Sequence, residues 1–222
     1  MSKVEQGIEY MKEHKYEEAA KLFTEAIEDS PNDPIGYINF GNLLLHLQDY
    51  ERAVNFFQKA LELEEHIPAA HYGLGNTYYE QGAYPLAQQH FEKSIANGLD
   101  DNSDVYFMLG MCFVQQNNFR LALPYLQRAV EINEKDVDAM FQYGLALAQS
   151  NQIDLAMDTF QKVLQLQQEH SDAHYNLAVC YLYKENTDKA LNHFNEAIKI
   201  QPDHLLALNG KEKVEQLLDE KH

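Results

Sequence analysis

Hydrophobic and polar positions along the chain repeat with a spacing of 34 or 35 residues. Each copy contains a small residue, a second small residue twelve positions later, and a large apolar residue four positions beyond that. The first small residues are Gly7, Gly41, Gly75, Gly110, Gly144 and Ala178. The second small residues are Ala19, Ala53, Ala87, Ala122, Ala156 and Ala190. The large apolar residues are Phe23, Phe57, Phe91, Leu126, Phe160 and Phe194. Six copies in register predict six repeats of one local structure.

The length of the repeat predicts a pair of helices joined by tight turns. Two helices of about 13 residues with their turns occupy roughly 34 residues. A small residue in the first helix lets the second helix cross it closely, and the large apolar residue fills the space between neighbouring hairpins. An apolar residue opens most second helices and is expected to pack back on the first helix: Tyr16, Tyr50, Tyr84, Phe119 and Ile153.

These residues resemble the tetratricopeptide repeat (TPR) family over about residues 2–202. In the second repeat Gly41, Ala53, Phe57 and Ala60 match the family pattern, whereas Leu44 stands where the family usually has tyrosine. The resemblance implies an all-α, right-handed superhelical solenoid of six helical hairpins plus a C-terminal capping helix, forming a single domain over 1–222. The repeats are expected at about 1–33, 34–67, 68–102, 103–136, 137–170 and 171–204, with the capping helix at 205–219.

Three segments, at 37–40, 121–130 and 201–204, are similar to the small stand-alone YrrB-type TPR proteins of Gram-positive bacteria. That narrower resemblance implies a role in bridging RNA-modification or RNA-processing enzymes through protein contacts.

Two features interrupt the regular pattern. The one extra residue falls in 97–103, where Gly98 is expected to end a helix in the left-handed conformation. Pro124 lies inside a second helix and is expected to kink or delay it.

The last predicted helix should shield the apolar face of the sixth hairpin. Its apolar side chains are Leu205, Leu208, Val214, Leu217 and Leu218.

The chain has 35 acidic and 17 basic residues and therefore a net charge of −18, which limits the kinds of partner it is expected to bind. Nucleic acids and anionic membranes are bound by clustered cations, so neither is expected as a ligand. The N-terminal residues 1–6 lack the apolar core of a signal peptide, and no run approaches the ~18 apolar residues of a membrane helix. With only two cysteines, the sequence favours a cytoplasmic location.

No motif for catalysis is present, because the chain lacks a nucleotide-binding glycine loop and the hydrolase and kinase signatures. His170 and His174 are four residues apart, but no carboxylate or thiol completes a metal site with them. Cys112 and Cys180 share a repeat position with apolar residues and are expected to be buried. We therefore expect neither an enzyme nor a bound metal or cofactor.

The family resemblance places the first helix of each hairpin along a concave groove, and the repeat pattern assigns side chains to that groove. They are mainly apolar and aromatic, which is typical of a binding surface on a soluble protein. Asparagine and glutamine interrupt them and can bond the backbone of an extended peptide. The predicted partner-binding residues are Ile38, Asn39, Asn42, Tyr72, Asn76, Tyr79, Phe107, Met111, Phe141, Gln142, Tyr175 and Asn176.

Alternative interpretations of this surface remain open. Neighbouring first helices could simply bury these side chains against each other. In the TPR proteins that bind chaperone tails, lysine and arginine clamp a carboxylate, but here Ile38, Tyr72 and Phe107 stand at those positions. Asp104, Asp138 and Asp172 either only favour their helix N-termini or also form an acidic rim that selects apolar ligands carrying Lys or Arg.

The leading prediction is a scaffold or adaptor that binds a protein or peptide in the groove. The alternative is a structural protein that associates with itself through its end helices.

Overall fold

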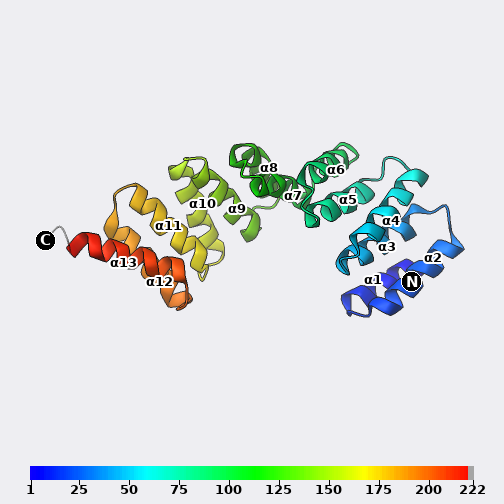
Figure 1. The fold of residues 1–222 in the computed structure, drawn as a ribbon, viewed down its shortest axis with the longest axis horizontal. Helices are drawn as coiled ribbons and strands as arrows, with labels where there is room; N and C mark the ends of the chain where they lie inside the picture. Colours follow the sequence, from blue (N-terminus) through cyan, green and yellow to red (C-terminus); the bar gives the residue numbers. More distant parts are fainter. Residues whose placement is uncertain (220–222) are drawn as a thin grey trace. The chain divides into compact units, whose positions relative to one another are not determined.

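The computed structural model describes residues 1–219, and that part of the chain consists of α-helices joined by short turns, with no strand (Figure 1). The chain divides into two compact units, Met1–Gln116 and the part from Asn117 onward, and each is described by itself. The first unit contains α1 (Lys3–Lys12), α2 (Tyr16–Asp29), α3 (Pro34–His46), α4 (Tyr50–Leu63), α5 (Pro68–Glu80), α6 (Tyr84–Ala96) and α7 (Ser103–Gln115). The second contains α8 (Phe119–Ile132), α9 (Val137–Gln149), α10 (Ile153–Leu166), α11 (Ser171–Tyr183), α12 (Thr187–Ile200) and α13 (Leu205–Asp219).

Consecutive helices pack as hairpins, as the repeat length predicts. In the first unit α1 packs with α2, α3 with α4 and α5 with α6; in the second α9 packs with α10 and α11 with α12. Within each unit, successive first helices also contact each other, so that α1, α3, α5 and α7 form one row and α9, α11 and α13 form another. The predicted all-α fold of repeated hairpins with a terminal helix is therefore confirmed.

The second helices begin at the residues predicted to open them. α2, α4, α6, α8 and α10 start at Tyr16, Tyr50, Tyr84, Phe119 and Ile153. Because α8 starts at the same repeat position as α4 and continues past Pro124, the expectation that this proline delays the helix is wrong. Gly98 has φ +119° just after α6 ends, which confirms its expected role as a helix terminator.

The turn inside each hairpin contains one residue in the left-handed conformation. These residues have φ between 57° and 72° and occupy the same repeat position: His14, Gln48, Gly82, Asn117, Asn151 and Glu185. Only Gly82 is a glycine, although a side chain in this region costs about 1 kcal/mol or more. Since the same turn forms six times with five residue types, hairpin packing rather than local preference determines its geometry.

This turn gives a stability prediction with an internal control. Gln48→Gly should raise the free energy of unfolding of the first unit by about 1 kcal/mol, because it removes the left-handed strain of an exposed side chain. Gly82→Ala should lower it by about the same amount, although an added Cβ meets no atom within 4 Å. Urea denaturation followed by circular dichroism measures both. Changes of the same sign in the two variants would show that backbone strain is not the cause.

The cores of the first, second, third and fifth hairpins are each built around one large ring that packs on a glycine. Phe23, Phe57, Phe91 and Phe160 are 0% exposed. A Cβ added at the glycine of the partner first helix would lie less than 3.0 Å from the ring in each case. The small residue that marks the repeat in the sequence is therefore the site where the two helices approach most closely.

The C-terminal helix α13 contacts the sixth hairpin with some of the predicted residues, Val214 and Leu218, and with small residues that were not predicted. Ala207 and Val214 are buried against the cluster around Phe194, and an added Cβ at Gly210 would lie 2.7 Å from that ring. The helix therefore shields the sixth hairpin as expected, but three of its five predicted apolar residues are exposed. Leu205, Leu208 and Leu217 are 71%, 38% and 58% exposed.

Candidate functional site

The rows of first helices carry the residues predicted to bind a partner, in two groups. In the first unit Asn42 is exposed. The other predicted residues of this unit, apart from Ile38, are half-buried: Asn39, Tyr72, Asn76, Tyr79, Phe107 and Met111. In the second unit those half-buried are Phe141, Gln142, Tyr175 and Asn176. Ile38 differs from the rest, because only 8% of it is exposed and it packs in the core cluster that contains Phe57. Its side chain is therefore withdrawn from any surface that a partner could contact.

The aromatic residues of this surface are held in place by their own hairpins. Tyr72 lies 5.9 Å from Phe91 between ring centroids, and burial raises the pKa of its hydroxyl. In the fifth and sixth hairpins Phe141 and Tyr175 pack in the same way on Phe160 and Phe194, at 5.8 and 6.0 Å. Each of these three rings therefore belongs partly to the core and offers only its remaining surface to a ligand.

The amides on the first helices are anchored at one end. The side-chain N–H groups of Asn39 and Asn176 each donate to a backbone carbonyl one turn earlier, at 2.8 Å. Gln115 donates to the hydroxyl oxygen of Tyr79 at 3.1 Å. Because a side-chain amide has both donors and an acceptor, the carbonyl oxygens of Asn39 and Asn176 keep the capacity to accept an N–H from a bound peptide.

Histidines cap two first helices of the second unit and cover its aromatic residues. Nδ1 of His170 accepts the N–H of Ala173 at the start of α11, and its ring lies 4.6 Å from the Phe141 ring. The equivalent His204 precedes α13 and lies 5.3 Å from the Tyr175 ring. These histidines therefore have a structural role, in capping the helices and packing on the aromatic rings.

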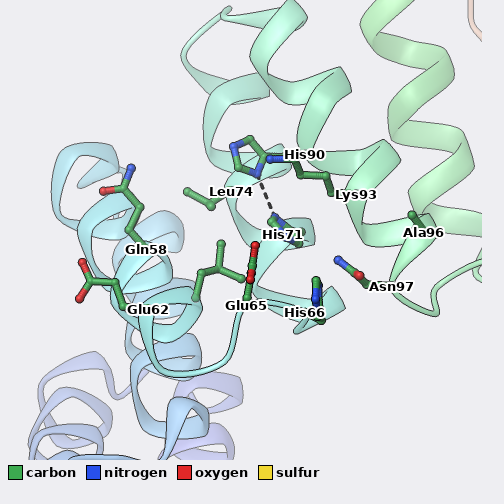
Figure 2. A pocket seen from close by; sticks show the side chains of 11 residues that line it. Gln58, Glu62, Glu65, His66, His71, Leu74, His90, Lys93, Ala96 and Asn97 are labelled. Atoms are coloured by element: carbon green, nitrogen blue, oxygen red, sulfur yellow. Dashed lines mark hydrogen bonds between the residues drawn. The ribbon is translucent and has the colours of Figure 1, made fainter.

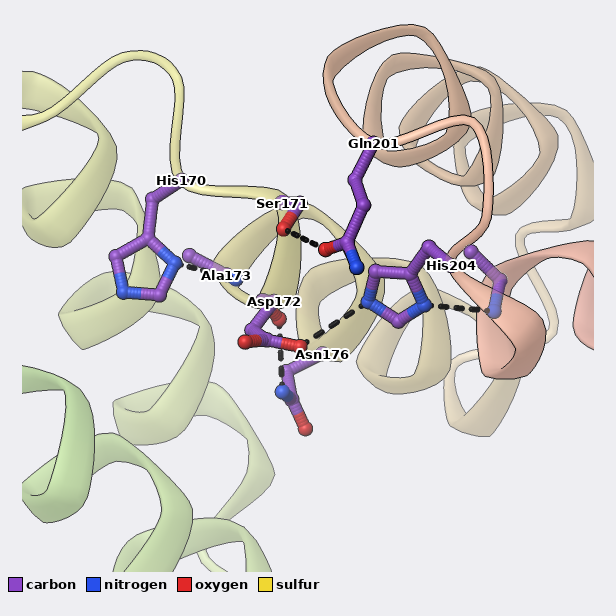
Figure 3. A network of polar contacts seen from close by, with 8 residues as sticks. His170, Ser171, Asp172, Ala173, Asn176, Gln201 and His204 are labelled. Carbon is purple, nitrogen blue, oxygen red and sulfur yellow. Dashed lines mark hydrogen bonds and ion pairs between the residues drawn. The ribbon is translucent and has the colours of Figure 1, made fainter.

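A polar network joins α11 to α13 through His204 (Figure 3). Nδ1 of His204 accepts the backbone N–H of Ala207 at 3.2 Å. The neutral imidazole therefore carries its proton on Nε2, which donates to Oδ1 of Asp172 at 3.1 Å. Beside it Ser171 donates to the amide oxygen of Gln201 at 3.0 Å. Asp172 thus performs the predicted first-turn role and also fixes α13, while its side chain remains 58% exposed.

A cavity of about 300 Å³ opens between α9 and α11 on the first-helix row of the second unit. Its wall contains the 42% exposed Val179 and the 62% exposed Tyr183, together with Asn176 from the predicted surface. The Tyr183 hydroxyl donates to the side chain of Asn151 at 2.8 Å, which fixes the ring at the edge of the cavity. This is the place on the row where a free apolar surface and a hydrogen-bonding amide meet.

Sequence reasoning missed Tyr183. It lies five positions after Ala178, the first small residue of its repeat, where the other repeats carry Lys12, His46, Glu80, Gln115 and Gln149. An aromatic at a position that is otherwise polar was the available signal.

The described residues offer little for chemistry at this surface. Burial raises the pKa of the Cys112 thiol to about 12 and that of Cys180 to about 11, so both are protonated at neutral pH. Within residues 1–219 no group of three or more His, Cys, Asp or Glu side chains is placed to hold a metal ion. None of the helices described has the length and apolar character needed to cross a membrane.

Family models described as tetratricopeptide repeat match residues 10–56, 35–100, 66–135, 107–169 and 171–204. No curated protein sequence matches the chain. Among solved structures, the chain is 47% identical to YrrB, described as a TPR protein with an unusual peptide-binding site; the match covers 87% of this chain and 99% of YrrB, with a TM-score of 0.80. Pseudomonas aeruginosa pilF is 16% identical over 95% of this chain and 96% of its own, with a TM-score of 0.82. MamA is 22% identical, and the match covers 75% of this chain and 90% of MamA, with a TM-score of 0.70.

The matches to pilF and MamA show the fold alone, whereas the match to YrrB extends to the sequence. TPR proteins are generally non-catalytic interaction modules, and this fold supports a role as a protein–protein interaction scaffold. The repeat lattice, the hairpin geometry and the sequence matches agree: the chain belongs to the tetratricopeptide repeat family.

Proposed function

We propose that this protein is a non-catalytic adaptor that binds an extended or helical segment of a partner protein along its first helices. The observation that carries the proposal is the cavity between α9 and α11, where Val179 and Tyr183 expose apolar surface beside Asn176. Soluble proteins seldom leave such surface uncovered without a ligand. The peptide-binding site described for YrrB, which is 47% identical, supports the same use of this fold.

The contacts suggest how a segment is held. One apolar side chain enters the cavity of about 300 Å³, and the neighbouring peptide N–H donates to the side-chain oxygen of Asn176. Further along the row Gln142 and the edges of Phe141 and Tyr175 extend the contact. In the first unit the corresponding surface is formed by Asn39, Asn42, Tyr72, Asn76, Tyr79, Phe107 and Met111.

The charge of the surface indicates the chemistry of the partner. Asp104, Asp138 and Asp172 lie in the first turns of their helices and are exposed, and the whole chain carries a net charge of −18. Opposite charge accelerates encounter and improves selectivity more than it adds affinity. We therefore propose a partner segment with apolar anchors flanked by Lys or Arg, whose binding weakens as salt is raised.

The resemblance to YrrB supports a bridging role between RNA-modification or RNA-processing proteins, with the adaptor in contact with protein rather than RNA. The excess of acidic residues agrees with this assignment, because RNA binding requires clustered cations.

Self-association is a second candidate function, favoured by α13. Leu205, Leu206 and Leu217 are 71%, 59% and 58% exposed, and a cavity of about 720 Å³ lies beside this helix and is lined in part by Leu182 and Val214. Light scattering over a wide range of protein concentration tests it. A mass that stays at that of one chain eliminates this alternative.

The binding proposal is tested with a peptide selected from a random display library. Val179→Glu/Tyr183→Ala should weaken its affinity by tenfold or more in calorimetry, because a charge replaces an anchor and an aromatic contact is lost. These side chains are better targets than Tyr72, Phe107 or Phe141, since truncating core-packed rings would also destabilise the fold.

Leu155→Ala is the matched control, since Leu155 is 52% exposed and is not among the residues of this cavity. Its affinity should equal that of the wild type. Equal affinity of wild type and the Val179/Tyr183 variant would place the binding site elsewhere.

A further inference from the structure

Two histidine pairs occupy the same positions in the third and sixth repeats. Nδ1 of His71 on α5 lies 3.2 Å from Nδ1 of His90 on α6 (Figure 2), and Nδ1 of His174 on α11 lies 2.9 Å from Nδ1 of His193 on α12. Each pair therefore links the two helices of one hairpin. His71 is 6% exposed and the other three histidines are half-buried.

The surroundings of the two pairs repeat as closely as the pairs themselves. The backbone carbonyls of Glu65 and Gln168, from the preceding turns, accept from His71 and His174 respectively. On the other side, the rings of His90 and His193 stack on tyrosines of their own hairpins, each at 5.4 Å and with interplanar angles of 29° and 13°.

These contacts specify where the protons lie at neutral pH. His71 donates through Nε2 to the carbonyl, which leaves its Nδ1 as an acceptor. His90 must then donate through Nδ1, because a hydrogen bond between two Nδ1 atoms needs one proton. By the same reasoning, His174 is the Nε2–H tautomer and His193 is the Nδ1–H tautomer.

Added protons act on this arrangement in two steps. A first proton can be shared in an N–H···N bond that carries one charge. A second proton sets two N–H groups against each other at about 3 Å and brings two positive charges together in a partly buried site. The doubly protonated pair cannot keep its hydrogen bond, so the two helices lose this link.

We propose that the two histidine pairs are proton-sensitive clamps that keep the third and sixth hairpins closed at neutral pH and loosen them in acid. Burial lowers the pKa of all four imidazoles, and that of His90 falls to about 4. Since the folded state binds these protons less readily than the unfolded state, stability falls as the pH drops below about 6.5.

Charged neighbours distinguish the two clamps. The first pair faces Lys93 on α6, Tyr78 on α5 and His66 in the turn before α5. Glu62 on α4 and Glu65 in the turn after it line the cavity beside the pair. The second faces Glu196, Lys189 and Lys199 on α12, Tyr181 on α11 and His170 in the turn. Glu196 stands where the first pair has Lys93, and its carboxylate raises the pKa of His174 and His193, so the sixth hairpin should lose less stability in acid than the third.

The clamps lie next to the proposed binding surface. His71 precedes Tyr72, and His174 precedes Tyr175 and Asn176. Loosening either hairpin should disturb those side chains and weaken partner binding, a consequence that rests on the proposed function. The clamp itself can be measured on the free protein, so its failure is distinguishable from failure of the binding proposal.

The second hairpin supplies a substitute that cannot titrate in this range. Its equivalent pair, Tyr37 and Phe56, packs with ring centroids 6.2 Å apart. His71→Tyr/His90→Phe and His174→Tyr/His193→Phe should therefore preserve packing while removing the clamp. Hydrogen–deuterium exchange of α5 and α6, and of α11 and α12, is measured at pH 7.5 and 5.5 after correction for the intrinsic rate.

In the wild type we expect opening to increase about tenfold at the lower pH, because a histidine kept neutral one unit below its ordinary pKa costs about a factor of ten. Each double variant should lose this increase in its own hairpin and keep it in the other. The same acid response in wild type and variant would overturn the proposal. So would nitrogen NMR at pH 7.5 showing His71 and His90 as the same tautomer, a result that does not depend on variants folding.

Discussion

Phe57→Ala is expected to lower the free energy of unfolding of the first compact unit by about 3 to 5 kcal/mol. The ring is 0% exposed and lies between two glycines. Gly41 belongs to its own hairpin and Gly73 to the next, so the cavity left by alanine would open in both hairpins. Because the two glycines lack side chains, neither can fill the space by changing its rotamer. Urea denaturation followed by far-ultraviolet circular dichroism measures the loss.

Leu86→Ala in the same unit is the control for this experiment. Leu86 is 44% exposed, so its truncation removes little buried surface and should cost less than about 1 kcal/mol. If both variants lost the same stability, the large ring would not be the element that joins successive hairpins.

The repeat made most of the fold predictable from the sequence. Small residues such as Gly41 and Gly75 mark close helix approach, and Tyr50 and Tyr84 mark the first residue of a second helix. The small residues recur six times and the apolar opening residue five times, so an accidental match at one repeat does not alter the register. The structure therefore agrees with the predicted start of five second helices.

The terminal helix was harder to predict, because its sequence pattern is no longer constrained by a following helix. Leucines in an amphipathic stretch suggested a buried face, yet Leu205 and Leu217 point away from the sixth hairpin. The contact is made by Val214 and Leu218 together with Ala207 and Gly210, which let α13 approach Phe194 closely. At this interface small residues contribute to the packed face beside the apolar ones, and a pattern of leucines alone does not identify it.

The candidate site could be predicted only at the level of the helix face. The repeat register placed Asn42 and Ile38 in the same groove, but Asn42 is exposed and Ile38 is buried. The exposure of a residue depends on how neighbouring rings fill the gap, which the spacing of small residues does not specify.

The histidine pairs were missed for a related reason. His71 and His90 lie on different helices, and each alone resembles an ordinary packing residue. Ring-bearing residues recur at the same two positions of the second repeat, as Tyr37 and Phe56, and this recurrence was the available signal; the structure shows that the two positions face each other. Comparing position pairs between repeats would have revealed the contact.

Gly73→Ala should lower the free energy of unfolding of the first unit by about 2 to 3 kcal/mol, although alanine favours helix over glycine by about 1 kcal/mol. The added Cβ would lie 2.3 Å from Cε1 of Phe57 and 2.4 Å from its Cζ, and the buried ring has little room to move. Urea denaturation of the single variant measures this loss against the wild type.

The double variant Gly73→Ala/Phe57→Ala separates steric conflict from other effects of the substitution. Once the ring is removed, the new methyl group fills part of the cavity and helix propensity favours alanine. Gly73→Ala should therefore be neutral or stabilising by up to about 1 kcal/mol in the Phe57→Ala background. Equal destabilisation in both backgrounds would mean that Gly73 is required for its backbone rather than for the space it leaves to Phe57.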